Sequence, residues 1–108
     1  MMYTVAMQYK DSWFALPQEK SSEATRAAVA YHDKYREEGK LKETYTYADG
    51  KLLSIWSVES FEDMLRIVRG HPYWGLVDVQ TEPCLDGPSL RKLMVPRGGA
   101  DRKAPETR

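Results

Sequence analysis

The chain has little cysteine, little histidine and no excess of either charge. It contains one cysteine, two histidines, 16 basic residues and 16 acidic residues. A single cysteine cannot form an intrachain disulfide, which favours a reducing compartment. Balanced charge argues against a general binder of nucleic acids or anionic membranes, because both partners require a basic surface. These shortages predict a cytoplasmic protein whose partners are neither nucleic acids nor membranes.

Long apolar runs and cofactor-binding motifs are also missing from the sequence. No segment approaches the about 18 consecutive apolar residues of a membrane-spanning helix. The opening residues, MMYTVAMQYK, lack the basic and apolar regions of a secretion signal. The histidines and Cys84 lack the spacing of a zinc site, and neither a glycine-rich phosphate loop nor a G-x-S-x-G motif occurs. We therefore expect no metal and no cofactor.

The hydrophobic periodicity predicts a β-α-β-β-α-β order of elements. Alternation with a period of two indicates strands at residues 2–10, 41–48, 52–58 and 76–82. Helical periodicity indicates helices at residues 22–38 and 61–69, and the Asp-Gly pair at 49–50 indicates a hairpin. This order is typical of an α+β, ferredoxin-like fold, in which two helices cover one face of a four-stranded antiparallel sheet.

The length of 108 residues predicts one domain. We expect this domain at residues 1–95, ending in an apolar tail at 84–95. Residues 96–108 are polar and rich in proline and glycine, which predicts disorder.

Side-chain patterns assign faces to the predicted elements. Ser21 or Ser22 is expected to cap the first helix, and Ser60 the second. Spacing predicts that Leu41, Glu43 and Tyr45 share one face of the second strand, with Thr44 and Thr46 on the other. The apolar stripe of the first helix is Ala24, Ala28, Tyr31 and Tyr35, and that of the second is Phe61, Met64, Leu65 and Val68.

The second face of the predicted sheet is too apolar for exposure to water. On the third strand, Leu52 and Trp56 point one way while Leu53 and Ile55 point the other, so both faces carry large apolar side chains. A sheet with one solvated face would alternate apolar with polar residues. A copy of the same chain could cover this face, so the sequence predicts a homodimer, or a larger homo-oligomer built from it.

Four segments together resemble the muconolactone isomerase family and, more broadly, the dimeric α/β-barrel superfamily. They are MYTVAMQYK, REEGKL, LLSIWSVESFEDM and HPYWGLVDVQTEPC, and the resemblance covers about residues 2–88. It implies a dimeric α/β barrel in which two sheets face each other, with a small-molecule pocket between each sheet and its helices. Members include isomerases, cofactor-free oxygenases, dehydratases, dechlorinating enzymes and haem-handling proteins, so the fold alone does not fix the reaction.

One departure from the family pattern bears on the substrate. Muconolactone isomerase is rich in acidic residues along its first helix, where this chain reads AAVAY at residues 27–31. This difference argues against the same isomerisation of the same diacidic lactone. It predicts a less polar pocket.

His32 is the leading candidate for a catalytic residue. It lies about 80° from the centre of the first helix's stripe, which places it at the margin of the expected pocket. An imidazole moves protons near neutral pH without a large pKa shift. The alternative is a structural histidine that hydrogen-bonds a tyrosine.

Other side chains are expected to line the pocket or its mouth. His71 lies between a helix stop and Pro72, in a turn that carries two aromatic residues. Each candidate has an alternative role in packing, at the sheet edge or at a subunit interface. The predicted substrate-binding residues are Tyr31, Tyr35, Glu43, Tyr45, Trp56, His71, Tyr73 and Trp74.

These observations favour a small-molecule enzyme of the muconolactone-isomerase-like type. It would transfer a proton without a cofactor, in an isomerisation, elimination or cyclisation of an apolar cyclic or unsaturated metabolite, with His32 as the acid or base. One alternative is a cofactor-free monooxygenase acting on a polycyclic phenol. Another is a non-catalytic module that binds a ligand or builds an oligomer.

Overall fold

The computed structural model describes residues 1–94 and contains every predicted strand and helix. The predicted disordered segment, residues 96–108, lies outside the described residues. Two short helices add to the predicted order. The elements are β1 (Met2–Tyr9), α1 (Asp11–Phe14), α2 (Gln18–Glu37), β2 (Leu41–Thr46), β3 (Leu52–Ser57), α3 (Phe61–Arg69), β4 (Val77–Cys84) and α4 (Gly87–Met94).

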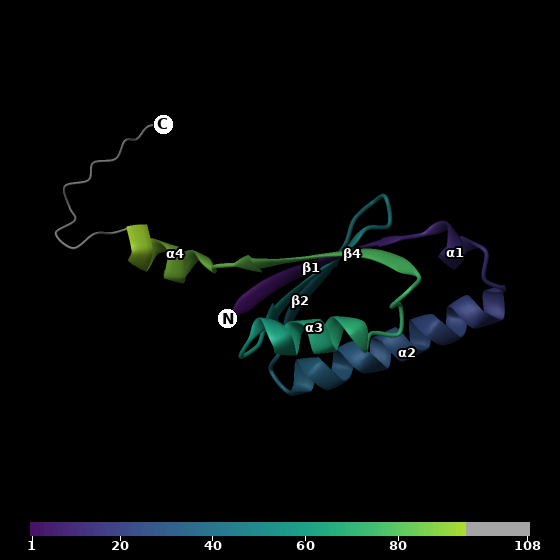
Figure 1. Cartoon of the computed structure of the whole chain (residues 1–108), viewed down its shortest axis with the longest axis horizontal. Coiled ribbons are helices and arrows are strands. Elements are labelled where there is room, and N and C mark those ends of the chain that lie inside the picture. The colour runs from purple at the N-terminus through teal and green to yellow at the C-terminus, as the bar shows by residue number, and fades with distance from the viewer. Residues whose placement is uncertain (95–108) are drawn as a thin grey trace.

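The four strands form one sheet in the order β2-β3-β1-β4, and every neighbouring pair is antiparallel. Helices α2 and α3 cover the same face of this sheet (Figure 1). The predicted α+β, ferredoxin-like fold is therefore confirmed. No helix within residues 1–94 is long and apolar enough to cross a membrane.

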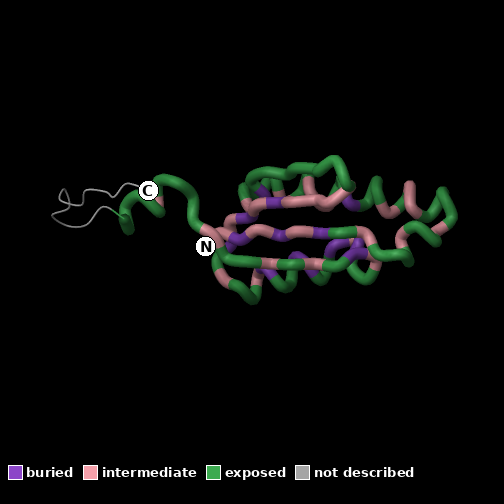
Figure 2. The backbone as a smooth tube through the Cα atoms, turned by 90° about the horizontal axis from the view of Figure 1, so that it is seen from above, coloured by how far each residue is buried: buried purple, intermediate pink, exposed green. Residues whose placement is uncertain are grey.

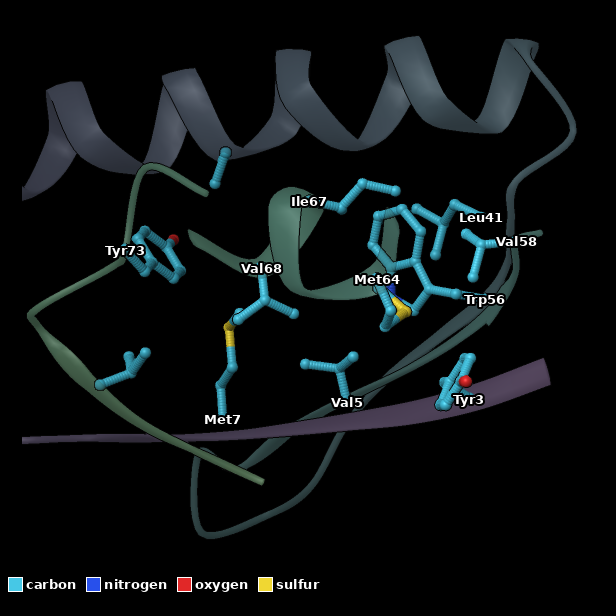
Figure 3. Close-up of a cluster of buried hydrophobic side chains, with 12 residues drawn as sticks. Tyr3, Val5, Met7, Leu41, Trp56, Val58, Met64, Ile67, Val68 and Tyr73 are labelled. Carbon is cyan, nitrogen blue, oxygen red and sulfur yellow. The ribbon is translucent and has the colours of Figure 1, made fainter. Parts of the chain in front are cut away.

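The core lies between the sheet and the two covering helices. On β1, Tyr3, Val5 and Met7 are buried while the residues between them are only partly buried, as the alternating sequence predicts. Figure 2 shows this alternation along the strands. From the opposite side, Met64 and Val68 of α3 extend toward these β1 side chains (Figure 3).

Helix α2 begins earlier than the sequence analysis predicted. Its first residue is Gln18, directly after Pro17, and the Ser21 hydroxyl donates a hydrogen bond to the Gln18 carbonyl instead of capping the helix. Proline suits a helix start because its ring fixes φ near the helical value and no backbone N–H is lost there. Only three residues separate this start from α1, whose Trp13 stacks on Tyr9 of β1 at a centroid distance of 4.6 Å.

The predicted common face of Leu41, Glu43 and Tyr45 is wrong. Leu41 pairs with Trp56, but Glu43 pairs with Ile55, so the register shifts between Leu41 and Glu43. One extra residue in a strand reverses the side of every residue that follows. Thr44 and Thr46 therefore face the helices with Ser54 and Leu52, while Glu43 and Tyr45 join Ile55 and Leu53 on the open face.

Helix α3 has the predicted bounds, but its buried side differs from the predicted stripe. Met64, Ile67 and Val68 are buried, whereas Phe61 and Leu65 are exposed. The Ser60 hydroxyl accepts a hydrogen bond from the Asp63 N–H, which confirms the predicted cap. Packing against the sheet thus selects Ile67 in place of Leu65.

The predicted apolar tail is partly ordered into regular structure. Strand β4 continues to Cys84, and α4 follows from Gly87 to Met94. Figure 1 shows α4 beyond the end of the sheet, away from α2 and α3. Leu85, Leu90, Leu93 and Met94 are exposed on this segment.

Candidate functional site

A cavity of about 190 Å³ lies between α2 and the sheet. Its residues come from β1, α2, β2, β3 and the loop before β4. None of them is an acidic residue, a lysine or an arginine. The cavity is lined by Met7, Tyr9, Thr25, Ala28, Val29, His32, Thr44, Tyr45, Thr46, Leu52, Leu53, Ser54 and Tyr73.

Helix α2 provides one wall of the cavity through a single face. Ala28 and Val29 each lie three or four positions from both Thr25 and His32, so the four residues form one face of the helix. The small side chain of Ala28, which is buried, leaves room between the helix and the sheet. The sequence departure at residues 27–31 therefore coincides with the space beneath the helix.

Hydroxyl groups supply most of the polarity of the cavity wall. The bulge in β2 brings Thr44 and Thr46 to this side, and the Tyr73 hydroxyl lies 3.3 Å from the Thr25 hydroxyl. Burial, together with neighbouring Tyr73, raises the pKa of Tyr9 to about 12, so its phenol remains protonated at neutral pH. The cavity thus offers uncharged hydrogen-bonding groups within an apolar enclosure.

The two histidines of the chain form a pair at the edge of this cavity. The Nε2 atoms of His32 and His71 are 3.0 Å apart. His71 is buried behind His32 and does not line the cavity. Its Nδ1 accepts a hydrogen bond from the backbone N–H of Tyr73 at 3.0 Å. His32, on the opposite side of the pair, lines the cavity.

Both imidazoles are less basic than an ordinary histidine. Burial, and to a smaller extent the neighbouring His32, lower the pKa of His71 from 6.5 to about 4. Burial also lowers the pKa of His32; Arg36 acts in the same direction and Asp33 opposes it. Both rings are therefore uncharged at neutral pH.

Acid is expected to destabilise the fold through His71. The unfolded chain takes up a proton on this ring near pH 6.5, whereas the folded chain does so only near pH 4, so the unfolded chain holds more protons between these values. The stability contributed by the neutral ring is complete above pH 6.5 and is lost as the pH falls toward 4. The expected loss in the free energy of unfolding, from pH 7 to pH 4, is about 3 kcal/mol.

Urea unfolding at both pH values measures this loss, with His71→Gln as the matched control. The variant keeps every carboxylate of the wild type, so the difference between the two pH dependences isolates the histidine. An identical pH dependence in the two proteins would contradict the assignment.

Three predicted site residues pack behind the histidine pair and do not line the cavity. The Tyr31 hydroxyl donates a hydrogen bond of 2.6 Å to the Ile67 carbonyl, and its ring lies 5.3 Å from that of His71. The ring of Trp56 lies 6.2 Å from that of His32, and its Nε1–H donates to the Ser54 hydroxyl at 2.7 Å. The ring of Tyr35 packs against Trp56 at 5.6 Å. These aromatic side chains support the two imidazoles.

The remaining predicted residues lie in different surroundings. Tyr73 lines the cavity with His32, and Tyr45 is also among the lining residues, although its pairing with Leu53 puts its side chain on the open face of the sheet. Glu43 is exposed on the open face of the sheet, and Trp74 is exposed beneath the Arg69 guanidinium, 5.5 Å from its carbon. The structure therefore brings together His32, His71 and Tyr73 and leaves Glu43 and Trp74 outside the site.

Several residues of the cavity wall were missed by the sequence analysis. Thr44 and Thr46 were assigned to the opposite face because the bulge in β2 has no marker in the sequence. Thr25 could have been found, since it lies seven residues before His32 and so on the same side of the helix. Tyr9 was recognised only as a strand residue.

The donor atoms near the histidine pair do not form a metal centre. Within residues 1–94, no group of three or more histidine, cysteine or acidic side chains is close enough to hold a metal ion. A histidine that binds a metal through Nε2 normally donates its Nδ1–H to an acceptor. In His71 the Nδ1 instead accepts a hydrogen bond from the backbone N–H of Tyr73, so the ring proton is on Nε2.

Together these features define a ferredoxin-like protein with a small uncharged cavity and a histidine pair beneath its long helix. Among solved structures, the chain is similar to muconolactone isomerase, with 18% identity, a TM-score of 0.63, and coverage of 82% of this chain and 93% of that chain. It is also similar to 5-chloro-2-hydroxyhydroquinone dehydrochlorinase (TftG) from Burkholderia phenoliruptrix, solved in complex with 2,5-dihydroxybenzoquinone. The identity there is 15% and the TM-score 0.62, covering 82% of this chain and 98% of that chain.

No protein-family model matches the chain, and no curated protein sequence matches it significantly. The resemblance to muconolactone isomerase that was predicted from the residues is therefore confirmed as a likeness of fold.

Proposed function

We propose that this protein is a cofactor-free enzyme that transfers a proton on a small, uncharged, unsaturated ring compound. The observation on which the proposal depends is the position of His32, an uncharged imidazole at the edge of an uncharged cavity. Such a site needs an oriented substrate and a group that meets the reacting atoms. The two solved structures named above are an isomerase and a dehydrochlorinase, and the latter holds a single-ring quinone. Both likenesses support a small ring compound as the ligand.

The size and charge of the cavity favour a neutral molecule with one ring. A cavity of about 150 Å³ is known to hold benzene, and this one measures about 190 Å³. A dicarboxylate would enter without a basic partner among the lining residues, which would leave its charges unpaired. The volume likewise favours one ring over the polycyclic phenol of the monooxygenase alternative.

A direct test uses cyclohex-3-enone, whose isomerisation to cyclohex-2-enone is detected by the ultraviolet absorption of the conjugated product. The expected result is a rate above that in buffer, with deuterium entering the product when the reaction is run in D₂O. A matched experiment with muconolactone is expected to give no turnover. Failure to bind or turn over neutral cyclic enones, with retained binding of dicarboxylates, would contradict the proposal. Oxygen uptake with a phenol would instead favour the monooxygenase.

We also propose that two chains associate through the open faces of their sheets. The centre of this face holds Leu53 and Ile55 beside Thr4 and Ala6, whereas Glu82 and other charged residues lie toward its edges. An apolar centre with a polar rim is typical of subunit interfaces. The exposed leucines of α4 could extend this contact onto the partner.

Replacing Ile55 with lysine is expected to convert the dimer into a monomer. The ammonium group would be buried opposite its own copy or a neighbouring apolar side chain, at a cost that the interface cannot offset. Light scattering after size-exclusion chromatography measures the mass, which should fall from twice the chain mass of 12.5 kDa to that mass. Leu65→Lys, on the exposed side of α3, is the matched control and should remain dimeric. A wild-type protein that is monomeric at micromolar concentration would refute this mode of association.

A further inference from the structure

The hydrogen bonds of His71 determine which of its ring nitrogens holds a proton. Its Nδ1 lies 3.0 Å from the backbone nitrogen of Tyr73, which can only donate. The Nδ1 atom therefore acts as an acceptor and has no proton. A neutral imidazole has one N–H, so the proton of His71 is on Nε2.

The proton position in His71 also determines the proton position in His32. The Nε2–H of His71 points at the Nε2 of His32 across 3.0 Å, so that the latter atom accepts the hydrogen bond. The single proton of neutral His32 is then on Nδ1. Within residues 1–94, no protein group forms a hydrogen bond with this Nδ1. It is therefore the nitrogen of the pair that is free to bind a ligand.

The opposite arrangement of protons is disfavoured by the backbone. If His32 donated through Nε2, His71 would have to accept there and place its proton on Nδ1. That proton would face the N–H of Tyr73, so two donors would meet in a buried site and one hydrogen bond would be lost. Protonating His32 at Nε2 is disfavoured for a similar reason. The added N–H would face the Nε2–H of His71, so two donors would again meet.

The surrounding structure holds the ring of His71 in this orientation. Only 4% of the residue is exposed, and the rings of Tyr31 and Tyr73 pack against it at 5.3 Å and 5.1 Å. Its backbone N–H donates to the Val68 carbonyl, and its carbonyl accepts from Trp74, within the turn that ends α3. The ring direction is thus set by a turn of the main chain as well as by side-chain packing.

From this geometry we infer that His71 is a positioning residue, which keeps His32 as a hydrogen-bond donor through Nδ1 toward a substrate oxygen. The inference rests on the proposed function and narrows it: the substrate has a carbonyl or similar acceptor oxygen, and His32 does not act as the base. As a C–H bond next to the carbonyl breaks, its proton passes to a water molecule and its electron pair moves onto the oxygen. The Nδ1–H of His32 stabilises that negative charge, and water returns a proton at the new position.

Nitrogen-15 NMR of the imidazoles at neutral pH tests the proton positions without any substrate. The expected spectrum shows a pyridine-like Nδ1 and a pyrrole-like Nε2 for His71, and the reverse for His32. Individual assignment comes from His32→Gln and His71→Gln. A pyrrole-like Nδ1 in His71, or a pyridine-like Nδ1 in His32, would overturn the inference. This measurement is independent of whether cyclohex-3-enone is turned over, so failure of the proposed function is recognised separately.

Two substitutions of His71 separate its two hydrogen bonds. His71→Gln places an amide N–H near the former Nε2 and retains a donor to His32, whereas His71→Asn retains an acceptor for the Tyr73 N–H and loses that donor. We expect kcat for cyclohex-3-enone to fall by about 10-fold to 100-fold in His71→Asn, by analogy with the range found for partners that orient a metal-bound histidine. The Gln variant should recover most of this loss, with KM little changed in both. A larger loss in His71→Gln than in folded His71→Asn would indicate that His71 serves only the turn and would refute the positioning role.

Discussion

Replacing His32 with alanine is expected to lower kcat for cyclohex-3-enone by about 100-fold to 1,000-fold, the effect of removing one donor from a developing oxyanion. The imidazole lines the cavity, whereas the supporting rings of Tyr31, Tyr35 and Trp56 lie behind it. Its removal leaves the methyl group of alanine, which cannot donate a hydrogen bond to a substrate. The rate constants are measured by the absorbance of the conjugated product under saturating substrate.

The control for this prediction must separate catalysis from folding. The alanine variant leaves the Nε2–H of His71 without its acceptor in a buried site, which costs about 1–3 kcal/mol of stability. Circular dichroism and urea unfolding therefore establish that the variant is folded at the assay temperature. Arg26→Ala, on the exposed side of α2, should retain the wild-type rate. A folded His32→Ala variant with the wild-type rate would exclude the imidazole from the reaction.

The largest expected effect on stability is that of Met64→Ala. Met64 has no exposed surface and packs between α3 and β1, in contact with the central side chains of the core. Truncation removes apolar contacts and leaves a cavity that the neighbouring strand can close only in part. The free energy of unfolding should fall by about 2–5 kcal/mol.

The adjacent residue on the same helix provides a matched comparison. Leu65 is 40% exposed, and Leu65→Ala should cost less than about 1 kcal/mol because much of its side chain already contacts water. Urea unfolding of both variants at one protein concentration measures the difference, since association would make stability depend on concentration. Equal losses in the two variants would contradict the observed orientation of α3.

The histidine pair explains how a site without charged residues could act on a carbonyl compound at neutral pH. A neutral imidazole that donates a hydrogen bond keeps its function as the pH rises through 7. An imidazole that must be positively charged to act loses its function as the pH rises above its pKa. Burial keeps both rings uncharged, and the backbone of the 71–76 turn orients them. Hydrogen-bond donation by His32 therefore depends on the turn that connects α3 to β4.

Much of the fold could be predicted because the relevant signals are local. Alternating residues such as Tyr3, Val5 and Met7 indicate a strand that is buried on one side, and this pattern survives folding. The Ser60 cap indicates the start of α3 for the same reason: its hydrogen bond joins residues three positions apart. The helical stripe of α2 likewise follows from spacing alone.

The face of an element was less predictable where a single residue changes the register. The bulge after Leu41 places Thr44 and Thr46 in the cavity wall and removes Glu43 from it. On α3, both Leu65 and Ile67 are apolar, and only the position of the helix on the sheet selects which one is buried. The neighbouring sequence indicates neither the bulge nor the buried side of α3. The bulge depends on how β2 pairs with β3, and the buried side of α3 depends on how the helix packs on the sheet.

By itself, the sequence determined the order of strands and helices, the resemblance to muconolactone isomerase, and His32 as the candidate at the margin of the pocket. Only the tertiary structure decided that His71, 39 positions later, meets it at 3.0 Å and that neither ring is charged. The physical reason is that periodicity reports which side of an element is apolar. The distance between two rings, their burial and the direction of their protons depend on how the turn after α3 packs against α2.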